Sequence, residues 1–393
     1  MAASDAGAIR NLKRRHALRT MAGFVAASPL LRAQHDPFRD HSRVPGLAEM
    51  RDAFDFEAVA YAKLPRYNYD YTACGTDSEF TLRRNRQAFE WVDLVPQRVL
   101  KEQTVEAATE ILSTRMKFPI MVSPSSGHLL LHPDGELATY QGATAASGTP
   151  YIVSNGSSFT FEKIAPAAKG TLWFQLFPKL EPDDNRYLLD RVLTAGAKAI
   201  VVTIDQQAAE HERVLHDHYL TTRVPATRRV APKNPYRLPE YRLYYSWKIL
   251  DDIRSFVKIP LLAKGILTAE DVRLCLEHGC DGVYVSNHGG RSLDYSPSTL
   301  EVLPEIVDAV GGKVPILFDS GVRRGADALK ALALGANAIC LGRVPRWGLA
   351  AYGAPGVQRI LELMQAELVQ AMAFTGRPTL SSLNRSIART DFP

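Results

Sequence analysis

The amino-acid sequence predicts an α/β protein built as one (β/α)8 barrel, or TIM barrel. Short apolar runs alternate with segments of helical spacing from residue 118 onward, as expected for buried parallel strands and their covering helices. Successive runs are mostly about 20 to 35 residues apart, which fits one strand and one helix per unit. Eight such units are the number that closes this barrel. The expected strands are residues 119–123, 151–154, 172–176, 199–204, 260–263, 282–286, 315–318 and 338–341.

The segment before the first strand, residues 51–117, is predicted to form an N-terminal helical cap. Its first part, residues 51–64, has apolar residues at helical spacing. Phe54, Val59 and Leu64 recur on roughly one face, so this face is expected to pack against the barrel.

Three further segments carry weaker signals. Tyr67, Tyr69 and Tyr71 alternate along the chain, which favours either a surface strand or an aromatic flap over a ligand. Residues 213–245 form a long polar insertion after the fourth strand, so they are predicted to be a lid or binding loop, with a disordered excursion as the alternative. Residues 355–373 have helical spacing and are expected to pack outside the barrel.

The N-terminus has the parts of a targeting leader. A basic run at 13–15 precedes a modest apolar segment at 21–31, and paired arginines favour the twin-arginine export route. Residues 1–34 are therefore predicted to be a signal peptide, residues 35–50 a linker, and residues 51–393 the barrel domain. Export would place the protein in the periplasm. A disordered basic tail on a cytoplasmic protein is the alternative.

Composition excludes several classes of protein. The net charge is +5, but the first 33 residues carry six basic residues and one acidic residue, so the remainder is formally neutral. No basic stripe interleaved with aromatics is present, and no nucleic-acid partner is expected. No apolar run approaches the roughly 18 residues of a membrane span. The four cysteines form no C-x-x-C pair and no His/Cys cluster has zinc spacing, so no metal site is expected.

Polar side chains follow each predicted strand, where catalytic groups lie in a parallel barrel. Together they supply one base, carboxylates, hydroxyls and several cations. They are Pro124, Ser125, Ser126, Ser154, Gln175, Thr203, Asp205, Lys264, Ser286, His288, Arg291, Asp319, Ser320, Gly321, Arg323, Gly342 and Arg343.

The last two strand ends predict an anion site. Residues 319–325 form a glycine-bounded turn that leads into a helix at 326–334, and Gly342-Arg343 follows the eighth strand. Loops in these positions, with a helix N-terminus, are a common phosphate site in TIM barrels. A phosphate-bearing ligand is therefore expected, with a solvent-exposed helix start as the alternative.

Four other strand-end residues suggest acid–base chemistry. A lysine at the end of a buried strand, Lys264, is costly unless it has a partner. Asp205 could orient His288 and stabilise its protonated form. Arg291, three residues after the histidine, suits a carboxylate.

Five motifs resemble the FMN-dependent α-hydroxy-acid oxidase/dehydrogenase family, which includes glycolate oxidase, lactate oxidase and mandelate dehydrogenase. The most specific is Ser-Asn-His-Gly-Gly-Arg-Ser-Leu-Asp at 286–294. The others are Leu-Pro-Arg-Tyr-Asn-Tyr-Asp-Tyr at 64–71, His-Pro-Asp-Gly-Glu at 132–136, Ala-Lys-Gly-Ile-Leu-Thr-Ala-Glu-Asp at 263–271 and Asp-Ser-Gly-Val-Arg-Arg-Gly at 319–325. The resemblance covers about residues 51–390.

The resemblance implies FMN as the cofactor and a role for each matching residue. His288 would be the base, with Asp205 as its partner, and Lys264 would face the N1/O2 edge of the flavin. Arg291 and Tyr71 would bind the substrate carboxylate. The FMN-binding residues would be Pro124, Ser125, Ser126, Ser154, Gln175, Thr203, Lys264, Ser286, Asp319, Ser320, Gly321, Val322, Arg323, Gly342 and Arg343.

Three departures from the family pattern fall on one wall of the expected site. Phe177 replaces a tyrosine whose hydroxyl would contact the substrate. Glu212 holds the position of a carboxylate-binding arginine, so Arg213 is the displaced candidate for that role. Gly156 replaces a large side chain. These changes indicate a roomier substrate pocket.

The expected reaction is oxidation of an L-2-hydroxy acid to the 2-oxo acid. The leader favours a dehydrogenase that passes electrons to a quinone or cytochrome rather than to oxygen. A larger substrate, such as a modified peptide or an alcohol, is one alternative, and a flavin-binding protein without turnover is another. The resemblance also implies a homo-oligomer, expected to be a tetramer.

Overall fold

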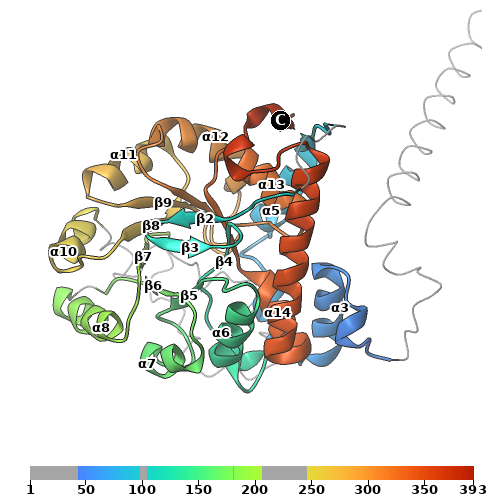
Figure 1. Ribbon diagram of the computed structural model, residues 1–393. Coiled ribbons are helices and arrows are strands. Elements are labelled where there is room, and N and C mark those ends of the chain that lie inside the picture. Colours follow the sequence, from blue (N-terminus) through green and yellow to red (C-terminus); the bar gives the residue numbers. More distant parts are fainter. Residues whose placement is uncertain (1–42, 98–103, 180, 206–245) are drawn as a thin grey trace, which may run out of the picture. The chain divides into compact units, whose positions relative to one another are not determined.

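A computed structural model describes residues 43–97, 104–179, 181–205 and 246–393. The structure given below belongs to the compact unit Gly46–Pro393. Eight parallel strands close into a barrel and helices surround it, which confirms the predicted fold class (Figure 1). The predicted lid at residues 213–245, and with it Arg213, lies outside the described residues.

The barrel strands coincide closely with the eight predicted apolar runs. Each strand pairs with the next in parallel, and the last pairs with the first through Cys340 and Met121. The largest difference is β8, which extends through Ile266, so Lys264 lies inside the strand rather than after it. The strands are β4 Ile120–Val122, β5 Tyr151–Ser154, β6 Leu172–Leu176, β7 Ile200–Thr203, β8 Leu261–Ile266, β9 Gly282–Val285, β10 Ile316–Phe318 and β11 Ala338–Leu341.

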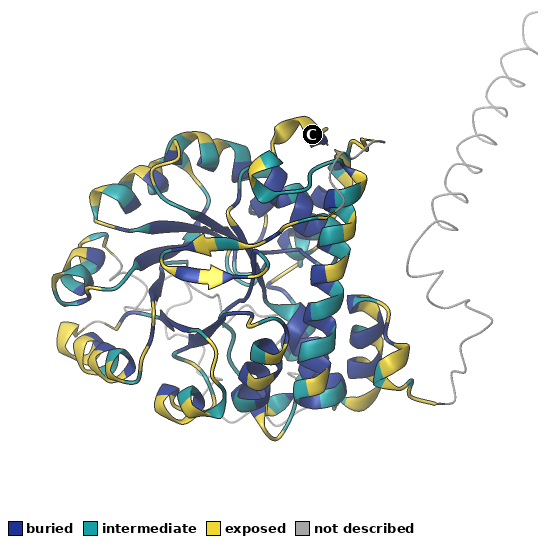
Figure 2. Ribbon diagram, in the orientation of Figure 1, coloured by how far each residue is buried: buried dark blue, intermediate teal, exposed yellow. Residues whose placement is uncertain are grey.

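The outer layer consists of helices that bury their apolar faces against these strands, with exposed residues on the outside (Figure 2). They are α6 Gly135–Ala145, α7 Phe161–Ile164, α8 Pro182–Thr194, α10 Lys248–Phe256, α11 Ala269–Glu277, α12 Thr299–Val310, α13 Gly325–Ala333 and α14 Arg343–Phe374. The backbone of α14 kinks at Tyr352 and Gly353, which have non-helical dihedral angles. None of the described helices combines the length and apolar character needed to cross a membrane.

Among the described residues, three helices precede the barrel: α3 Ala53–Lys63, α4 Arg66–Ala73 and α5 Phe80–Gln87. The predicted apolar face of the first helix is partly wrong, because Phe54 is exposed while Phe56, Val59 and Ala60 are buried. The tyrosines at 67, 69 and 71 lie on α4, so the surface strand that was one of the two alternatives does not form there.

Short elements complete the fold. The hairpin β2 Thr109–Ile111 and β3 Thr114–Met116 is antiparallel, and β1 Val92–Leu94 pairs with β12 Ala388–Thr390. In the part of the chain that the structure describes, the 3-10 helices are η1 Leu47–Glu49, η2 Ala88–Trp91, η3 His128–Leu130, η4 Ala165–Ala167, η8 Leu380–Ser382 and η9 Arg385–Ile387.

The barrel interior is a packed core. Its apolar cluster takes Met121, Trp173, Leu262 and Tyr284 from the strands and Met116 from the β2–β3 hairpin. Cys340 belongs to the same cluster, and all four cysteines are free thiols. A filled interior leaves the carboxyl ends of the strands as the place for a pocket.

Candidate active site

A ring of polar side chains lies one step above this apolar core, because strand side chains repeat their direction every second residue. Trp173 and Leu262 face the interior, and Gln175 and Lys264 come two positions later. The same step leads from each interior residue to the ring, which therefore comprises the side chains of Ser123, Ser154, Gln175, Thr203, Lys264, Ser286 and Asp319, while its eighth position is Gly342, which has no side chain.

Two adjoining cavities open above this ring. The larger contains about 760 Å³ of space between protein atoms, including part of its open mouth, and the smaller about 280 Å³. Five residues line both cavities: Pro124, Ser125, Ser126, Lys264 and His288. The shared wall makes them parts of one site.

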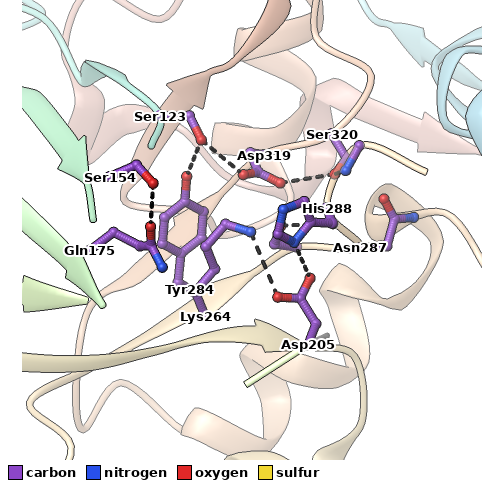
Figure 3. A network of polar contacts seen from close by, with 12 residues as sticks. Ser123, Ser154, Gln175, Asp205, Lys264, Tyr284, Asn287, His288, Asp319 and Ser320 are labelled. Carbon is purple, nitrogen blue, oxygen red and sulfur yellow. Dashed lines mark hydrogen bonds and ion pairs between the residues drawn. The ribbon is translucent and has the colours of Figure 1, made fainter. Parts of the chain in front are cut away.

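His288, Asp205 and Lys264 form the acid–base cluster of the site (Figure 3). The Nδ1 atom of His288 lies 3.2 Å from Oδ2 of Asp205, and the Nζ atom of Lys264 lies 3.9 Å from Oδ1 of the same carboxylate. The Lys264 side chain is only 3% exposed. An ionised carboxylate only accepts hydrogen bonds, so the proton of neutral His288 resides on Nδ1 and Nε2 keeps its lone pair.

The backbone of His288 is in the left-handed region, with φ of 59°. This conformation costs a non-glycine residue about 1–3 kcal/mol, and such strain persists only where neighbouring contacts hold it. One such contact is local, because the Oγ atom of Ser286 accepts from the His288 amide at 3.1 Å. This backbone conformation directs the imidazole from the end of β9 toward Asp205.

Tyr71 and Arg291 lie together on one side of the larger cavity. The Arg291 guanidinium lies over the Tyr71 ring at 5.1 Å, and its Nη1 donates to the Tyr71 carbonyl at 2.6 Å. The Tyr71 hydroxyl lies 3.2 Å from Oγ of Ser126. A cation beside two hydroxyls is a donor set that suits a carboxylate.

Phe177 occupies the wall where the sequence lacks the expected tyrosine. Its ring stacks on the His288 imidazole, with centroids 6.0 Å apart and planes 20° from parallel. Gly156 adjoins Ser126, since an added Cβ would lie 3.2 Å from the Ser126 Cβ. Phe177 therefore makes this part of the smaller cavity apolar where the resemblance implies a hydroxyl, and Gly156 has no side chain where the resemblance implies a large one.

Arg323 and Arg343 supply positive charge to the larger cavity. Burial and the nearby charges of Arg323 and Arg291 lower the pKa of Arg343 to about 9. Burial, with an added contribution from Arg86, lowers the pKa of Arg323 to about 10. Neither has an ion pair with a carboxylate among the described residues. Because arginine stays protonated in proteins, these lowered pKa values indicate a site that would be stabilised by an anion.

The helix expected to direct its N-terminus at this anion site was the one predicted at residues 326–334, which is α13, but its first amides are already bound. The first amides of α13 already have acceptors: those of Arg323 and Arg324 donate to Asp327 at 2.9 and 3.0 Å, and that of Gly325 donates to Glu367 at 2.7 Å. The helix that begins beside the cavity is α14, directly after Gly342. Its positive end favours an anion.

The structure brings nearly all the predicted site residues together. Those that line the two cavities are Tyr71, Pro124, Ser125, Ser126, Ser154, Gln175, Thr203, Lys264, His288, Arg291, Asp319, Ser320, Gly321, Val322, Arg323, Gly342 and Arg343. Asp205 lies behind His288, and Ser286 is fully buried beneath it. Arg213 lies outside the described residues.

Five residues that line the larger cavity were not among the predicted site residues: Thr72, Ser123, Gly289, Cys340 and Arg346. Ser123 lies in the polar ring and its Oγ donates to Asp319 at 3.2 Å; the two-residue step from Met121 would have found it. Thr72 and Arg346 also line the larger cavity, and Arg346 donates to the Thr72 hydroxyl at 2.7 Å. Arg346 lies one helical turn after Arg343, a spacing that places both on one face.

FMN fits this set of donors. Gln175 Nε2 and Thr203 Oγ1 are buried polar atoms without a hydrogen-bond partner, and both residues line the smaller cavity. Such atoms favour a polar ligand, since an unsatisfied buried donor is costly. A polar ring, a buried lysine and paired arginines match a planar heterocycle that carries a phosphate. Fold and site together define a flavin-binding barrel enzyme.

The chain belongs to the FMN-dependent dehydrogenase family, whose sequence profile matches residues 60–390. It is 37% identical over 348 residues to the peroxisomal (S)-2-hydroxyacid oxidase GLO3 of Arabidopsis thaliana, covering 86% of this chain and 96% of that one. It is 35% identical over 358 residues to the glycolate oxidase of Spinacia oleracea, covering 88% and 97%.

Solved structures agree with this assignment. A crystal structure of mandelate oxidase with benzoyl-formic acid superposes with a TM-score of 0.77 at 33% sequence identity. The match covers 87% of this chain and 99% of that one.

Proposed function

We propose that this protein oxidises an L-2-hydroxy acid to the corresponding 2-oxo acid with FMN as its cofactor. The observation that carries the proposal is the pairing of His288 with Asp205 at the wall shared by both cavities. The relatives named above are oxidases of hydroxy acids, which supports the same substrate class here.

The residues of the site divide the reaction between them. Arg291 and Tyr71 hold the substrate carboxylate, which fixes the hydroxyl-bearing carbon near His288. Nε2 of His288 takes the hydroxyl proton, and Asp205 stabilises the imidazolium that results. FMN, when bound, would accept the hydrogen of the hydroxyl-bearing carbon together with the two electrons of its C–H bond, so that loss of this hydrogen and of the hydroxyl proton leaves the 2-oxo group. Lys264, Gln175 and Thr203 would hold the cofactor, since Lys264 lines both cavities and Gln175 Nε2 and Thr203 Oγ1 are left without another partner.

We propose oxygen as the electron acceptor, because the named relatives are oxidases. A quinone or cytochrome remains the alternative that the predicted leader supports.

The proposed domain organisation keeps residues 1–34 as a twin-arginine signal peptide and residues 35–50 as a linker. In the domain at 51–393, α3 to α5 act as a cap, since Tyr71 and Thr72 of α4 line the larger cavity. A homotetramer is the proposed assembly.

Anaerobic mixing with a panel of 2-hydroxy acids tests the function. We expect L-lactate, glycolate or L-mandelate to bleach the flavin absorbance of the purified protein. Because the proton acceptor is lost, His288→Gln should slow this bleaching by at least about 100-fold. Oxygen consumption by the parent, compared with reduction of a quinone or cytochrome, identifies the acceptor.

Two results would contradict the proposal. One is that no 2-hydroxy acid of the panel bleaches the flavin absorbance of the FMN-loaded protein, whereas a larger alcohol or a peptide bleaches it. The other is bleaching that is equally fast in His288→Gln, which would exclude His288 as the base.

A further inference from the structure

Asn85 of α5 and Asn287 of the loop after β9 form a reciprocal amide pair. Nδ2 of Asn85 donates to Oδ1 of Asn287 at 2.8 Å, and Nδ2 of Asn287 donates to Oδ1 of Asn85 at 2.7 Å. The two residues are only 2% and 3% exposed. They are 202 positions apart in the chain, so the pair joins the N-terminal helices to the loop that carries His288.

The pair completes the hydrogen bonding of Asn287. Its second amide proton is donated to the Pro297 carbonyl at 3.1 Å, and its Oδ1 also accepts from the Gly290 amide at 3.2 Å. A carboxamide has two donors and an oxygen with two lone pairs, so this side chain has no free position. Half of its hydrogen bonds go to Asn85, and the Asn287 side chain is thereby fixed.

Asn287 precedes His288 directly, and Figure 3 shows its side chain on the far side of His288 from Lys264. The left-handed backbone of His288 is strained, so it depends on contacts that hold both flanks. Ser286 holds the His288 amide from the barrel. Asn85 holds the other side of the loop from α5.

The rest of the loop is anchored to the same N-terminal region. The Asp294 carboxylate accepts from the Ser78 and Thr81 amides at 3.0 and 2.9 Å, and the Gly290 carbonyl accepts from the Thr76 amide at 3.0 Å. The residue after His288 is held from the barrel, because the Gly289 amide donates to Ser320 Oγ at 3.1 Å and Arg343 donates to the Gly289 carbonyl at 2.9 Å. The amide pair holds the residue before His288.

We infer that Asn85 is a positioning residue of the active site, which holds Asn287 and thereby keeps the His288 imidazole directed toward Asp205. The inference rests on the proposed function in taking His288 as the base. It assigns a catalytic consequence to a residue that lines neither cavity and lies outside the barrel.

Asn85→Leu tests the inference, since leucine has a similar size but cannot pair with Asn287. We expect the rate of flavin reduction by the best hydroxy acid to fall about 10- to 100-fold, because small displacements of reacting groups have effects of this size. FMN content and reduction by dithionite should be unchanged. Gln365→Leu is the matched control, because Gln365 is also buried and its amide donates to Thr149 at 2.9 Å, away from the site.

A second measurement does not depend on turnover. The ring protons of His288, assigned by their loss in His288→Gln, feel the stacked ring of Phe177. We expect Asn85→Leu to shift or broaden these signals in the FMN-loaded protein, and Gln365→Leu to leave them in place. If the parent oxidises no hydroxy acid, the proposed function fails while this measurement still tests the positioning.

Asn85→Asp provides the third arm, including the case in which Asn85→Leu does not fold. The introduced carboxylate can accept from Asn287 Nδ2 but cannot donate to its Oδ1 until it is protonated. Burial should raise the pKa of that carboxyl, so the rate deficit relative to the parent should shrink as the pH falls. A rate deficit of Asn85→Asp that does not change with pH would overturn the inference. So would flavin-reduction rates and His288 signals that are the same in Asn85→Leu and Gln365→Leu.

Discussion

His128 shows at the scale of one residue how a buried side chain can support the pocket without entering it. It is 1% exposed, and its ring nitrogens lie 2.8 Å from the hydroxyls of Ser125 and Thr139. Ser125 lines both cavities, so His128 fixes a pocket hydroxyl from behind. Burial and the charge of Arg346 hold the pKa of His128 well below its usual value.

This lowered pKa makes His128 a source of acid sensitivity. The unfolded chain takes up a proton near pH 6.5, whereas the folded protein does not, so the stability from His128 is present above that pH and is lost as the pH falls. Between pH 7 and pH 5, the free energy of unfolding measured with urea should fall by up to about 2 kcal/mol more in the parent than in His128→Gln.

The variant His278→Gln controls for the loss of a histidine as such, since His278 is partly exposed and lies away from the pocket. Equal acid-side losses in the parent and in His128→Gln would show that His128 does not cause the sensitivity.

At the scale of elements, α5 and the loop after β10 meet at a contact that only glycine permits. Gly321 has φ of 86°, and an added Cβ would lie 2.1 Å from the Asn85 carbonyl oxygen. Arg86 of α5 also donates to the Gly321 carbonyl. Gly321 lines the larger cavity, so the docking of α5 and the shape of the proposed phosphate site depend on the same residue.

Gly321→Ala should therefore weaken both the docking of α5 and the binding of FMN. We expect a loss of unfolding free energy of about 2 kcal/mol or more and a raised Kd for FMN, because the substitution adds a steric clash to a strained backbone. Gly312→Ala is the matched control, since Gly312 also has a positive φ, of 74°, but open space around it. Similar losses in the two variants would mean that backbone strain alone, and not the approach of α5, explains the effect.

At the scale of the whole molecule, the described fold is a barrel whose active-site loop is held by helices that precede it in the chain. The proposed leader lies ahead of those helices. The twin-arginine route reads an arginine pair, and such a route suits a protein that folds around its cofactor before export.

Changing the pair by Arg14→Lys/Arg15→Lys tests the leader directly. We expect the parent chain, expressed in a bacterium with this route, to accumulate FMN-loaded in the periplasm and the double variant to remain in the cytoplasm. Fractionation followed by flavin fluorescence distinguishes the two. A parent that stays in the cytoplasm would instead favour the basic tail.

The sequence by itself determined the barrel and most of the pocket, because both follow from local patterns. Apolar runs at regular spacing specify strands, and the residues at the strand ends must converge when parallel strands close. His288 and Arg343, which the motif at 286–294 and the eighth strand end predicted as site residues, both line the larger cavity. Ser123 was within reach of the same two-residue alternation.

Only the tertiary structure decided how the N-terminal helices complete the site. The alternating tyrosines left a surface strand and an aromatic flap as the alternatives and did not indicate the helix α4 that forms there, from which Tyr71 reaches the cavity. The Asn85–Asn287 pair joins positions 202 residues apart, which no local pattern can indicate. The helix beside the anion site is α14 and not α13, since Asp327 and Glu367 already bind the α13 amides. Hydrogen bonds between distant segments depend on packing, and packing is fixed only when the whole chain is folded.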